Sequence, residues 1–288
     1  MKAIDRAISE STGSPFQLHT SASVAGGCIN ETFCIEGKDG RQFFVKKNQA
    51  SFRSFFKAEA RALTEIRETQ TVHVPEVIAH GVENDKAFLV LEFMEEGTAS
   101  PSGQAKLGTL LAKMHRVEQA HFGWGMDNCI GATPQPNPKS KNWAEFYRDH
   151  RLSHQFNLAA QKGRRFEGAN DLLAQIDSFF STYHPHPSLL HGDLWGGNAS
   201  YDSAGMPFIF DPASYYGDRE TDLAFTYMFG GFNSDFYQAY EQEYPLNSGF
   251  KVRKTLYNLY HELNHFNLFG GGYSSSAQSS INELLRQS

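Results

Sequence analysis

The chain has 288 residues, of which 40% are apolar and 20% are charged, and this ordinary globular composition allows one large domain or roughly two smaller ones. Its net charge of −6 argues against a general nucleic-acid or anionic-membrane partner. Three cysteines cannot build a disulfide framework, and the sequence has neither an apolar run of about 18 residues nor the apolar core of a signal peptide. We therefore expect a cytoplasmic protein and exclude collagen-like, membrane-spanning, disulfide-rich and wholly disordered classes.

The first third of the sequence predicts mainly β-structure. From about Leu18 to Val90, short runs of β-forming residues alternate with turns, and one helical segment interrupts them between Phe52 and Thr69. The β runs comprise residues 32–35, 42–45, 76–79 and 87–91. A stretch rich in glycine, serine and proline, residues 97–103, then ends this pattern.

The remainder of the sequence predicts mainly helices. Apolar residues recur at i, i+3, i+4 and i+7 from Leu107 to Met114. Further helical segments fall near residues 143–162, 171–183, 222–229, 233–243 and 250–268. The sequence thus predicts an α+β fold with two lobes: a small N-terminal β-sheet lobe with one main helix (residues 1–95) and a larger, mainly helical C-terminal lobe (residues 96–288).

The sharpest motif is the segment Leu190-His-Gly-Asp-Leu-Trp-Gly-Gly-Asn198. After it, residues 202–205 predict a turn, and residues 207–210 predict a strand that ends at Asp211. A hairpin of this kind would bring Asn198 and Asp211 to the same open end. Their oxygen atoms there would suit Mg²⁺, which proteins usually hold with a few oxygens together with substrate phosphates.

The spacing of Asp193 and Asn198 is by itself more typical of an Asx-turn loop with solvated side chains. Together with His191 and the later Asp211, however, it matches the catalytic and metal-binding segments of kinases. The match is to a His-Gly-Asp form, which is found in small-molecule kinases. We therefore predict phosphoryl transfer at this motif.

Two upstream residues predict an ion pair that would support the same chemistry. Glu59 falls on the apolar stripe of the helix at 52–69, where an unpaired buried carboxylate would cost about 3–5 kcal/mol. Lys46 ends the β run 42–45 and is the natural partner. Kinases use a strand lysine paired with a helix glutamate to hold the phosphates of ATP. Taken alone, Glu59 could instead reach the edge of its helix, and Lys46 could be a plain surface lysine.

The segment Gly26-Gly-Cys-Ile-Asn30 lies between two β runs. Gly26 and Gly27 permit close backbone approach to an anion and are candidates for a loop over the phosphates, although an ordinary hairpin turn fits them as well. Cys28 lies in the same loop. Backbone amides there would favour the reactive thiolate, so Cys28 is a candidate redox-sensitive residue, with a small turn-filling residue as the alternative.

Taken together, these motifs closely resemble those of the fructosamine kinase (ketosamine-3-kinase) family, which has a protein-kinase-like fold related to aminoglycoside and choline kinases. The resemblance runs nearly from end to end. It also includes residues 131–137 (Gly-Ala-Thr-Pro-Gln-Pro-Asn), 215–224 and 264–273. The Leu-Trp continuation of His-Gly-Asp, the Thr-Pro-Gln-Pro-Asn segment and the Gly-Gly-Tyr ending distinguish this family from its relatives.

The resemblance implies an enzyme that uses ATP and Mg²⁺ to phosphorylate the 3-hydroxyl of a ketosamine, the Amadori adduct of a sugar and an amine. The phosphate destabilises the adduct and releases the amine, so ketosamine metabolites or glycated proteins would be the substrates. Asp193 would orient or deprotonate the attacking hydroxyl. Asp211 would bind Mg²⁺, with Asn198 as a second oxygen ligand. Lys46 would contact the phosphates of ATP, and Glu59 would hold Lys46.

The resemblance also assigns contacts to adenine and to the sugar. Glu92, Phe93 and Met94 resemble the hinge, where main-chain groups meet adenine. Trp195 would line the sugar pocket with an apolar face.

The same resemblance implies that four further polar residues either support the catalytic loop or contact the substrate. His191 would support the catalytic loop, and Asp222 would brace its backbone. Asp218 and Glu220 would face a cationic substrate amine, although acidic residues at this place also suit the first turn of a helix.

Three other functions remain open on the sequence. A kinase for another hydroxylated amine, such as an aminoglycoside or choline, would share most of these motifs, and a non-catalytic nucleotide-binding module would share the fold. His261-Glu262-Leu-Asn-His265 matches the H-E-x-x-H pattern of zinc hydrolases, although its flanking residues fit the kinase family. We expect a monomer or weak dimer, and the preferred sugar and amine stay open.

Overall fold

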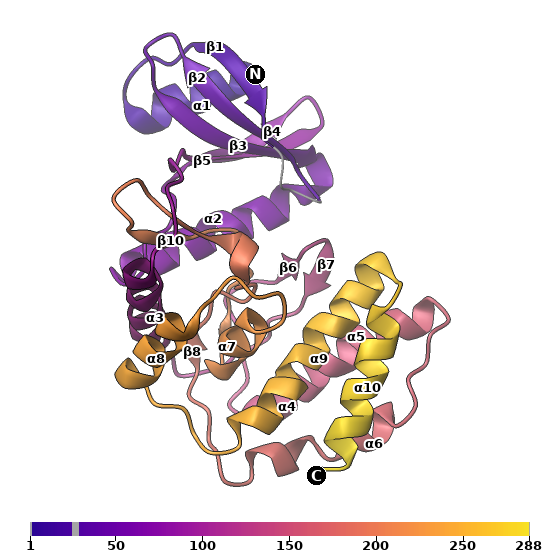
Figure 1. Cartoon of the computed structure of the whole chain (residues 1–288). Helices are drawn as coiled ribbons and strands as arrows, with labels where there is room; N and C mark the ends of the chain where they lie inside the picture. The colour runs from indigo at the N-terminus through magenta and orange to yellow at the C-terminus, as the bar shows by residue number, and fades with distance from the viewer. Residues whose placement is uncertain (1, 25–28, 288) are drawn as a thin grey trace.

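The computed structural model describes residues 2–24 and 29–287. The N-terminal part forms a five-stranded antiparallel sheet with two helices, and the C-terminal part is mostly helical (Figure 1). Across the sheet the strands follow the order β1-β2-β3-β5-β4. Their bounds are β1 (Leu18–Ser23), β2 (Glu31–Gly37), β3 (Gln42–Gln49), β4 (Val77–Glu83) and β5 (Lys86–Glu92). The predicted α+β fold class is confirmed.

One helix packs against each face of this sheet. The helices are α1 (Lys2–Thr12) and α2 (Arg53–Glu68), the second preceded by the 3₁₀ turn η1 (Ala50–Phe52). On one face, Ile4 and Ile8 of α1 pack in a cluster with Val45. On the other face, Leu89 belongs to the core beneath α2. Because successive side chains along a strand point to opposite faces, Lys46 lies on the α2 side of β3.

The C-terminal part is built around the long helix α9, which packs against α5, α7 and α10 (Figure 1). The helices are α3 (Pro101–His115), α4 (Trp143–Tyr147), α5 (Ser153–Gln161), α6 (Ala169–Ala174), α7 (Glu220–Thr226), α8 (Ser234–Glu243), α9 (Phe250–Phe269) and α10 (Tyr273–Leu285). A π-helical turn, η2 (Arg148–Leu152), joins α4 to α5, and η3 (Ile176–Phe180) is a 3₁₀ helix. Among the described residues, no helix is both long and apolar enough to cross a membrane.

Three short antiparallel ladders contain or flank the motif residues. They are β6 (Asn128–Ile130) with β7 (Thr133–Gln135), β8 (Ser188–Leu189) with β11 (Tyr216–Gly217), and β9 (Ala199–Tyr201) with β10 (Pro207–Ile209). The β9–β10 hairpin confirms the predicted turn at 202–205. In this turn, Asp202 Oδ1 accepts hydrogen bonds from the N–H groups of Ala204 and Met206, which is the Asx geometry that closes a short hairpin.

The connection between the two parts is residues 93–100, which contain neither helix nor strand. The N–H of Gly97 donates to the carbonyl of Tyr201 at 2.6 Å and so ties this connection to the β9–β10 hairpin. We propose the lobe boundary within this segment, at residue 95.

The close packing of α3 on α8 leads to a first prediction. A Cβ on Gly108, in the middle of α3, would clash with the carbonyl oxygen of Phe236 in α8. Alanine favours helix over glycine by about 1 kcal/mol, but overpacking a tight contact costs about 1–3 kcal/mol. We therefore expect Gly108→Ala to lower the thermal unfolding midpoint. The exposed substitution Lys113→Ala on the same helix should change it little, and a Gly108→Ala protein as stable as wild type would contradict the contact.

Candidate active site

Lys46 lies between two carboxylates on the α2 face of the sheet. Its Nζ donates a hydrogen bond to Glu59 Oε1 at 2.6 Å and also pairs with Asp211 Oδ1. The side chains of Lys46 and Glu59 are 3% and 14% exposed, whereas that of Asp211 is 44% exposed. The two residues that the sequence predicts as partners thus form an ion pair, and Asp211 joins them from the C-terminal part.

Burial and charge act in opposite directions on this cluster. Burial alone would lower the pKa of Lys46, but the charges and hydrogen bonds of Asp211 and Glu59 outweigh it and raise the pKa. Burial raises the pKa of Glu59, and Lys46 opposes that rise. Breaking a buried pair by removing one partner costs about 3–5 kcal/mol, because it leaves an uncompensated charge. Lys46 is therefore a fixed positive charge at this place.

The β9–β10 hairpin brings Asn198 and Asp211 to its open end, as the sequence predicts. The N–H of Phe210 donates to the carbonyl of Asn198 at 3.1 Å. At Asp211 the backbone φ is +58°, in the left-handed region that aspartate and asparagine tolerate better than most residues. The chain therefore leaves the strand conformation at Asp211.

Asp193 and Asn198 are joined within the segment of residues 190–198, which we call the catalytic loop after the role that the sequence predicts for it. Asn198 Nδ2 donates to the carbonyl oxygen of Asp193 at 2.8 Å and to its Oδ2 at 3.3 Å. Because Asn198 uses its amide nitrogen for these bonds, its amide oxygen is the atom that can ligate a cation.

The electrostatics of Asp193 suit proton transfer. Burial and the negative charge of Asp211 raise the pKa of Asp193 to about 7, although the hydrogen bond from Asn198 opposes the rise. A carboxyl group with a pKa near the working pH can accept a proton and release it again.

His191 connects the catalytic loop to the strand that leads to Asp211. Its fully buried ring places Nε2 2.9 Å from the carbonyl oxygen of Phe210, and since a carbonyl can only accept, this nitrogen carries the proton. Nδ1 then accepts the N–H of Asp193 at 3.3 Å. Burial lowers the pKa of His191, in agreement with a neutral ring.

Asp222, at the start of α7, accepts hydrogen bonds from the backbone of the catalytic loop. Its Oδ2 accepts the N–H of His191 at 2.7 Å and its Oδ1 that of Gly192 at 2.8 Å, and His115 Nε2 lies 3.1 Å from Oδ2. Burial alone would raise the pKa of Asp222, but the hydrogen bond and electrostatic effect of His115 outweigh it and lower the pKa. Gly192 has φ +83°, and a Cβ there would clash with the carbonyl of Ala213. This is the bracing geometry that the resemblance implies for Asp222.

Two buried amides to which the sequence analysis gives no role hold the segment after Asp211. Asn128 Nδ2 donates to the carbonyl of Ser214 at 2.8 Å, and Gln135 Nε2 donates to that of Ala213 at 3.1 Å. Both amides come from the β6–β7 hairpin. Gln135 belongs to the Thr-Pro-Gln-Pro-Asn motif, which signals importance in the sequence but does not reveal which backbone the amide meets.

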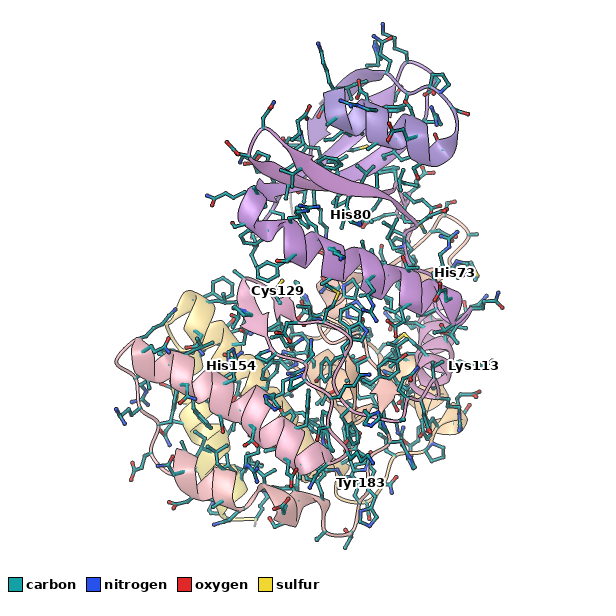
Figure 2. All side chains as sticks on the ribbon, turned by 180° about the vertical axis from the view of Figure 1, so that it is seen from behind. His73, His80, Lys113, Cys129, His154 and Tyr183 are labelled. Atoms are coloured by element: carbon teal, nitrogen blue, oxygen red, sulfur yellow. The ribbon has the colours of Figure 1, made fainter. Side chains whose placement is uncertain are left out.

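The structure corrects the expectation for Asp218 and Glu220. Asp218 accepts hydrogen bonds from Tyr183 Oη at 2.8 Å and Tyr257 Oη at 2.5 Å, and Figure 2 labels Tyr183 low in the helical part. Glu220 forms a two-point ion pair with Arg253 at 2.6 and 2.9 Å. The two acidic residues are 1% and 0% exposed. They do not face a substrate amine, because both are enclosed and paired within the protein.

The remaining predicted contacts lie beside these residues or outside the described part. Glu92 ends β5, and Phe93 and Met94 follow it, partly buried. Trp195 is exposed and follows Asp193 by two residues. The adenine and sugar contacts assigned to these residues stay predictions. Gly26, Gly27 and Cys28 lie outside the described residues.

The donors at the open end of the β9–β10 hairpin fit Mg²⁺, because the carboxylate of Asp211 and the amide oxygen of Asn198 are hard oxygen ligands. The histidines of the H-E-x-x-H segment take part in packing and hydrogen bonding within the helical part. In residues 2–24 and 29–287, no three His, Cys, Asp or Glu side chains are grouped to hold a metal ion. Instead, the ring of His261 stacks on Phe225 with 3.6 Å between centroids, and His265 Nδ1 donates to the carbonyl of His261 at 2.7 Å.

Comparison with known proteins agrees with this geometry. A sequence model of the fructosamine kinase family matches residues 1–287. The chain belongs to the fructosamine kinase family. A probable ketoamine kinase of Synechocystis sp. is 45% identical over 99% of this chain and 97% of its own length. The chloroplastic protein-ribulosamine 3-kinase of Arabidopsis thaliana is 40% identical over 95% of this chain and 85% of its own length.

Solved structures place this fructosamine kinase family member among kinase-like folds. A putative fructosamine-3-kinase of Haemophilus somnus is 32% identical with a TM-score of 0.91, covering 98% of this chain and 96% of its own. A choline kinase of Streptococcus pneumoniae, at 14% identity and a TM-score of 0.65 over 100% and 99% of the two chains, shares the fold alone. The chain is therefore a phosphotransferase with an alcohol group as acceptor, and its family implies the use of ATP.

The raised pKa of Asp193 predicts that ionisation of this carboxyl group lowers the stability of the folded protein as pH rises. Because this pKa of about 7 lies above the ordinary aspartate value of about 3.9, the contribution of the carboxyl group to stability is full below about pH 4 and is lost as pH rises through about 7. We therefore expect Asp193→Asn to raise the thermal unfolding midpoint at pH 8 and to gain less at pH 5.

The control for this measurement is Asp177→Asn, at an exposed aspartate of η3. Its midpoint should follow that of the wild type at both pH values. An Asp193→Asn protein that is less stable than wild type at pH 8 would refute the assigned electrostatics.

Proposed function

We propose that this enzyme transfers the γ-phosphate of ATP to the 3-hydroxyl of the sugar part of a ketosamine, of the ribulosamine or fructosamine type. One observation carries the proposal: the carboxyl group of Asp193 accepts a hydrogen bond from Asn198 and has a pKa suited to a base. The negative charge of Asp211 helps to raise that pKa, and Asp211 also contacts Lys46. The ketoamine and ribulosamine kinases among the relatives support this substrate class.

In the proposed reaction, Asp193 takes the proton of the 3-hydroxyl as the hydroxyl oxygen bonds to the γ-phosphorus and the bond to the ADP oxygen breaks. His191 and Asp222 hold the loop that carries Asp193, so the carboxylate meets the hydroxyl without rearrangement of the backbone. The sugar stacks on Trp195.

In this proposal, residues from both the N-terminal and the C-terminal part of the chain bind ATP, the phosphate donor. Lys46 contacts the α- and β-phosphates, and Glu59 fixes its position. Asp211 and Asn198 would hold Mg²⁺, which when bound neutralises charge on the transferred phosphoryl group. The main chain of Glu92, Phe93 and Met94 contacts adenine, and we assign Gly26 and Gly27, which are outside the described residues, to phosphate binding by the family resemblance.

The product determines the biological role that we propose. A phosphate on the 3-oxygen destabilises the adduct and releases the free amine, so the reaction reverses glycation. The substrates are small ketosamines or glycated proteins. We further propose a cytoplasmic location and a monomeric or weakly dimeric state.

The proposal is tested by offering ribulosyl-lysine, fructosyl-lysine, kanamycin and choline with ATP and Mg²⁺. We expect ADP release with at least one ketosamine, with the new phosphate on the sugar 3-oxygen by phosphorus and carbon NMR. Asp193→Asn should lower kcat by at least about 100-fold while the Kd for ATP stays unchanged.

Asp177→Asn, which changes an exposed aspartate away from these residues, should keep full activity. Transfer to kanamycin or choline with none to either ketosamine would overturn the substrate class. Near-normal turnover of Asp193→Asn would overturn its role as base.

A further inference from the structure

An exposed aromatic surface extends from Trp195, to which the proposed function assigns the sugar, and its other three residues have no role in the chemistry described above. We define it by Trp195, Phe229, His265 and Phe269. Ring centroids are 5.9 Å apart from Trp195 to Phe229, 5.2 Å from Phe229 to His265 and 5.8 Å from His265 to Phe269. Trp195, Phe229 and Phe269 are 39%, 43% and 57% exposed. A continuous exposed aromatic patch of this kind marks a binding surface more often than a scattered surface residue does.

The backbone holds this surface against the loop that carries Asp193. Gly196, next to Trp195, packs directly on Gly230 and Gly231, next to Phe229. A Cβ on Gly231 would lie 2.7 Å from the Cα of Gly196, and Gly231 has φ +96°. The glycines thus allow two loops to touch, and this contact sets Phe229 beside Trp195.

His265 adds one hydrogen-bond acceptor to the surface. Its Nδ1 lies 2.7 Å from the carbonyl oxygen of His261, which can only accept, so the proton is on Nδ1. Nε2 of the neutral ring then carries a lone pair. Burial lowers the pKa of His265, which agrees with the neutral form.

The chemistry of a ketosamine explains what such a surface would bind. The nitrogen that joins the sugar to the rest of the adduct is a secondary amine, which is a cation with two N–H donors near neutral pH. Aromatic faces attract such cations, and an alkyl chain next to the nitrogen adds apolar contact. The acidic residues Asp218 and Glu220 are not available for this cation, because they are buried and paired.

We propose that the aromatic surface binds the cationic amine and adjoining alkyl chain of the ketosamine while its sugar lies at Asp193, with His265 Nε2 accepting an amine hydrogen. This inference rests on the proposed function, because it concerns the same substrate. In Figure 1, the end of α9 and the start of α10 lie toward the β6–β7 hairpin, at the end of the helical part that faces the sheet. A substrate seated there extends from the catalytic loop along the C-terminal part, so the surface selects for the amine side of the adduct.

The test compares ribulosyl-butylamine with its N-acetylated form, in which the nitrogen is neutral. In the wild type we expect the KM for the charged acceptor to be about 3- to 10-fold lower than for the neutral one. Phe229→Leu, which keeps an apolar side chain but removes the ring, should raise the KM for the charged acceptor about 3-fold or more and reduce this preference. The KM for ATP should not change.

The matched control is Tyr227→Leu. Tyr227 is 42% exposed, but its ring stacks on Tyr237 at 4.2 Å and lies outside the aromatic surface. Its substitution should leave the preference as in wild type. Equal KM values for the two acceptors in the wild type, or an unchanged preference in Phe229→Leu, would overturn the inference while phosphorylation of the ketosamine continues. Absence of transfer to any ketosamine would instead overturn the proposed function.

Discussion

The structure depends on a buried lysine that two carboxylates from distant parts of the chain compensate. Lys46 comes from the central sheet, Glu59 from the helix that packs on it, and Asp211 from the C-terminal part, 165 positions away. Apolar packing fixes the distance between such elements only loosely, whereas a buried charge requires its partners at hydrogen-bond distance. The ion pair therefore aligns the sheet with the β9–β10 hairpin, and this alignment is what a phosphoryl-transfer site needs from its two parts.

A second set of buried polar groups holds the backbone that carries the reactive side chains. Asp222 accepts two N–H groups of the catalytic loop, the neutral ring of His191 bridges Asp193 to Phe210, and Gln135 holds a carbonyl after Asp211. Because satisfied buried hydrogen bonds rigidify their surroundings, these groups fix the backbone of the loop.

The hydrophobic periodicity of the sequence predicts most of the helices and strands. It does not predict the partner of a buried polar side chain when that partner lies far away along the chain. The strands around Lys46 and the helix of Glu59 follow from periodicity, and the β9–β10 hairpin follows from its turn residues. The sequence patterns do not predict helices α1 and α10, since α1 has only Ile4 and Ile8 as buried apolar residues and α10 begins with a run of serines of low helix propensity. The sequence does not reveal the ion pair of Glu220, because its partner Arg253 lies 33 positions away.

The central claim is that Glu59 holds Lys46 where the phosphates of ATP bind. Its most direct test is the Kd of Mg·ATP for the wild type and Glu59→Gln, measured by isothermal titration calorimetry together with the thermal unfolding midpoint of each protein. We expect a folded Glu59→Gln protein whose Kd is weaker by about 10-fold, equivalent to about 1.4 kcal/mol of lost binding free energy. A folded Glu59→Gln protein that binds Mg·ATP as tightly as the wild type would contradict the account.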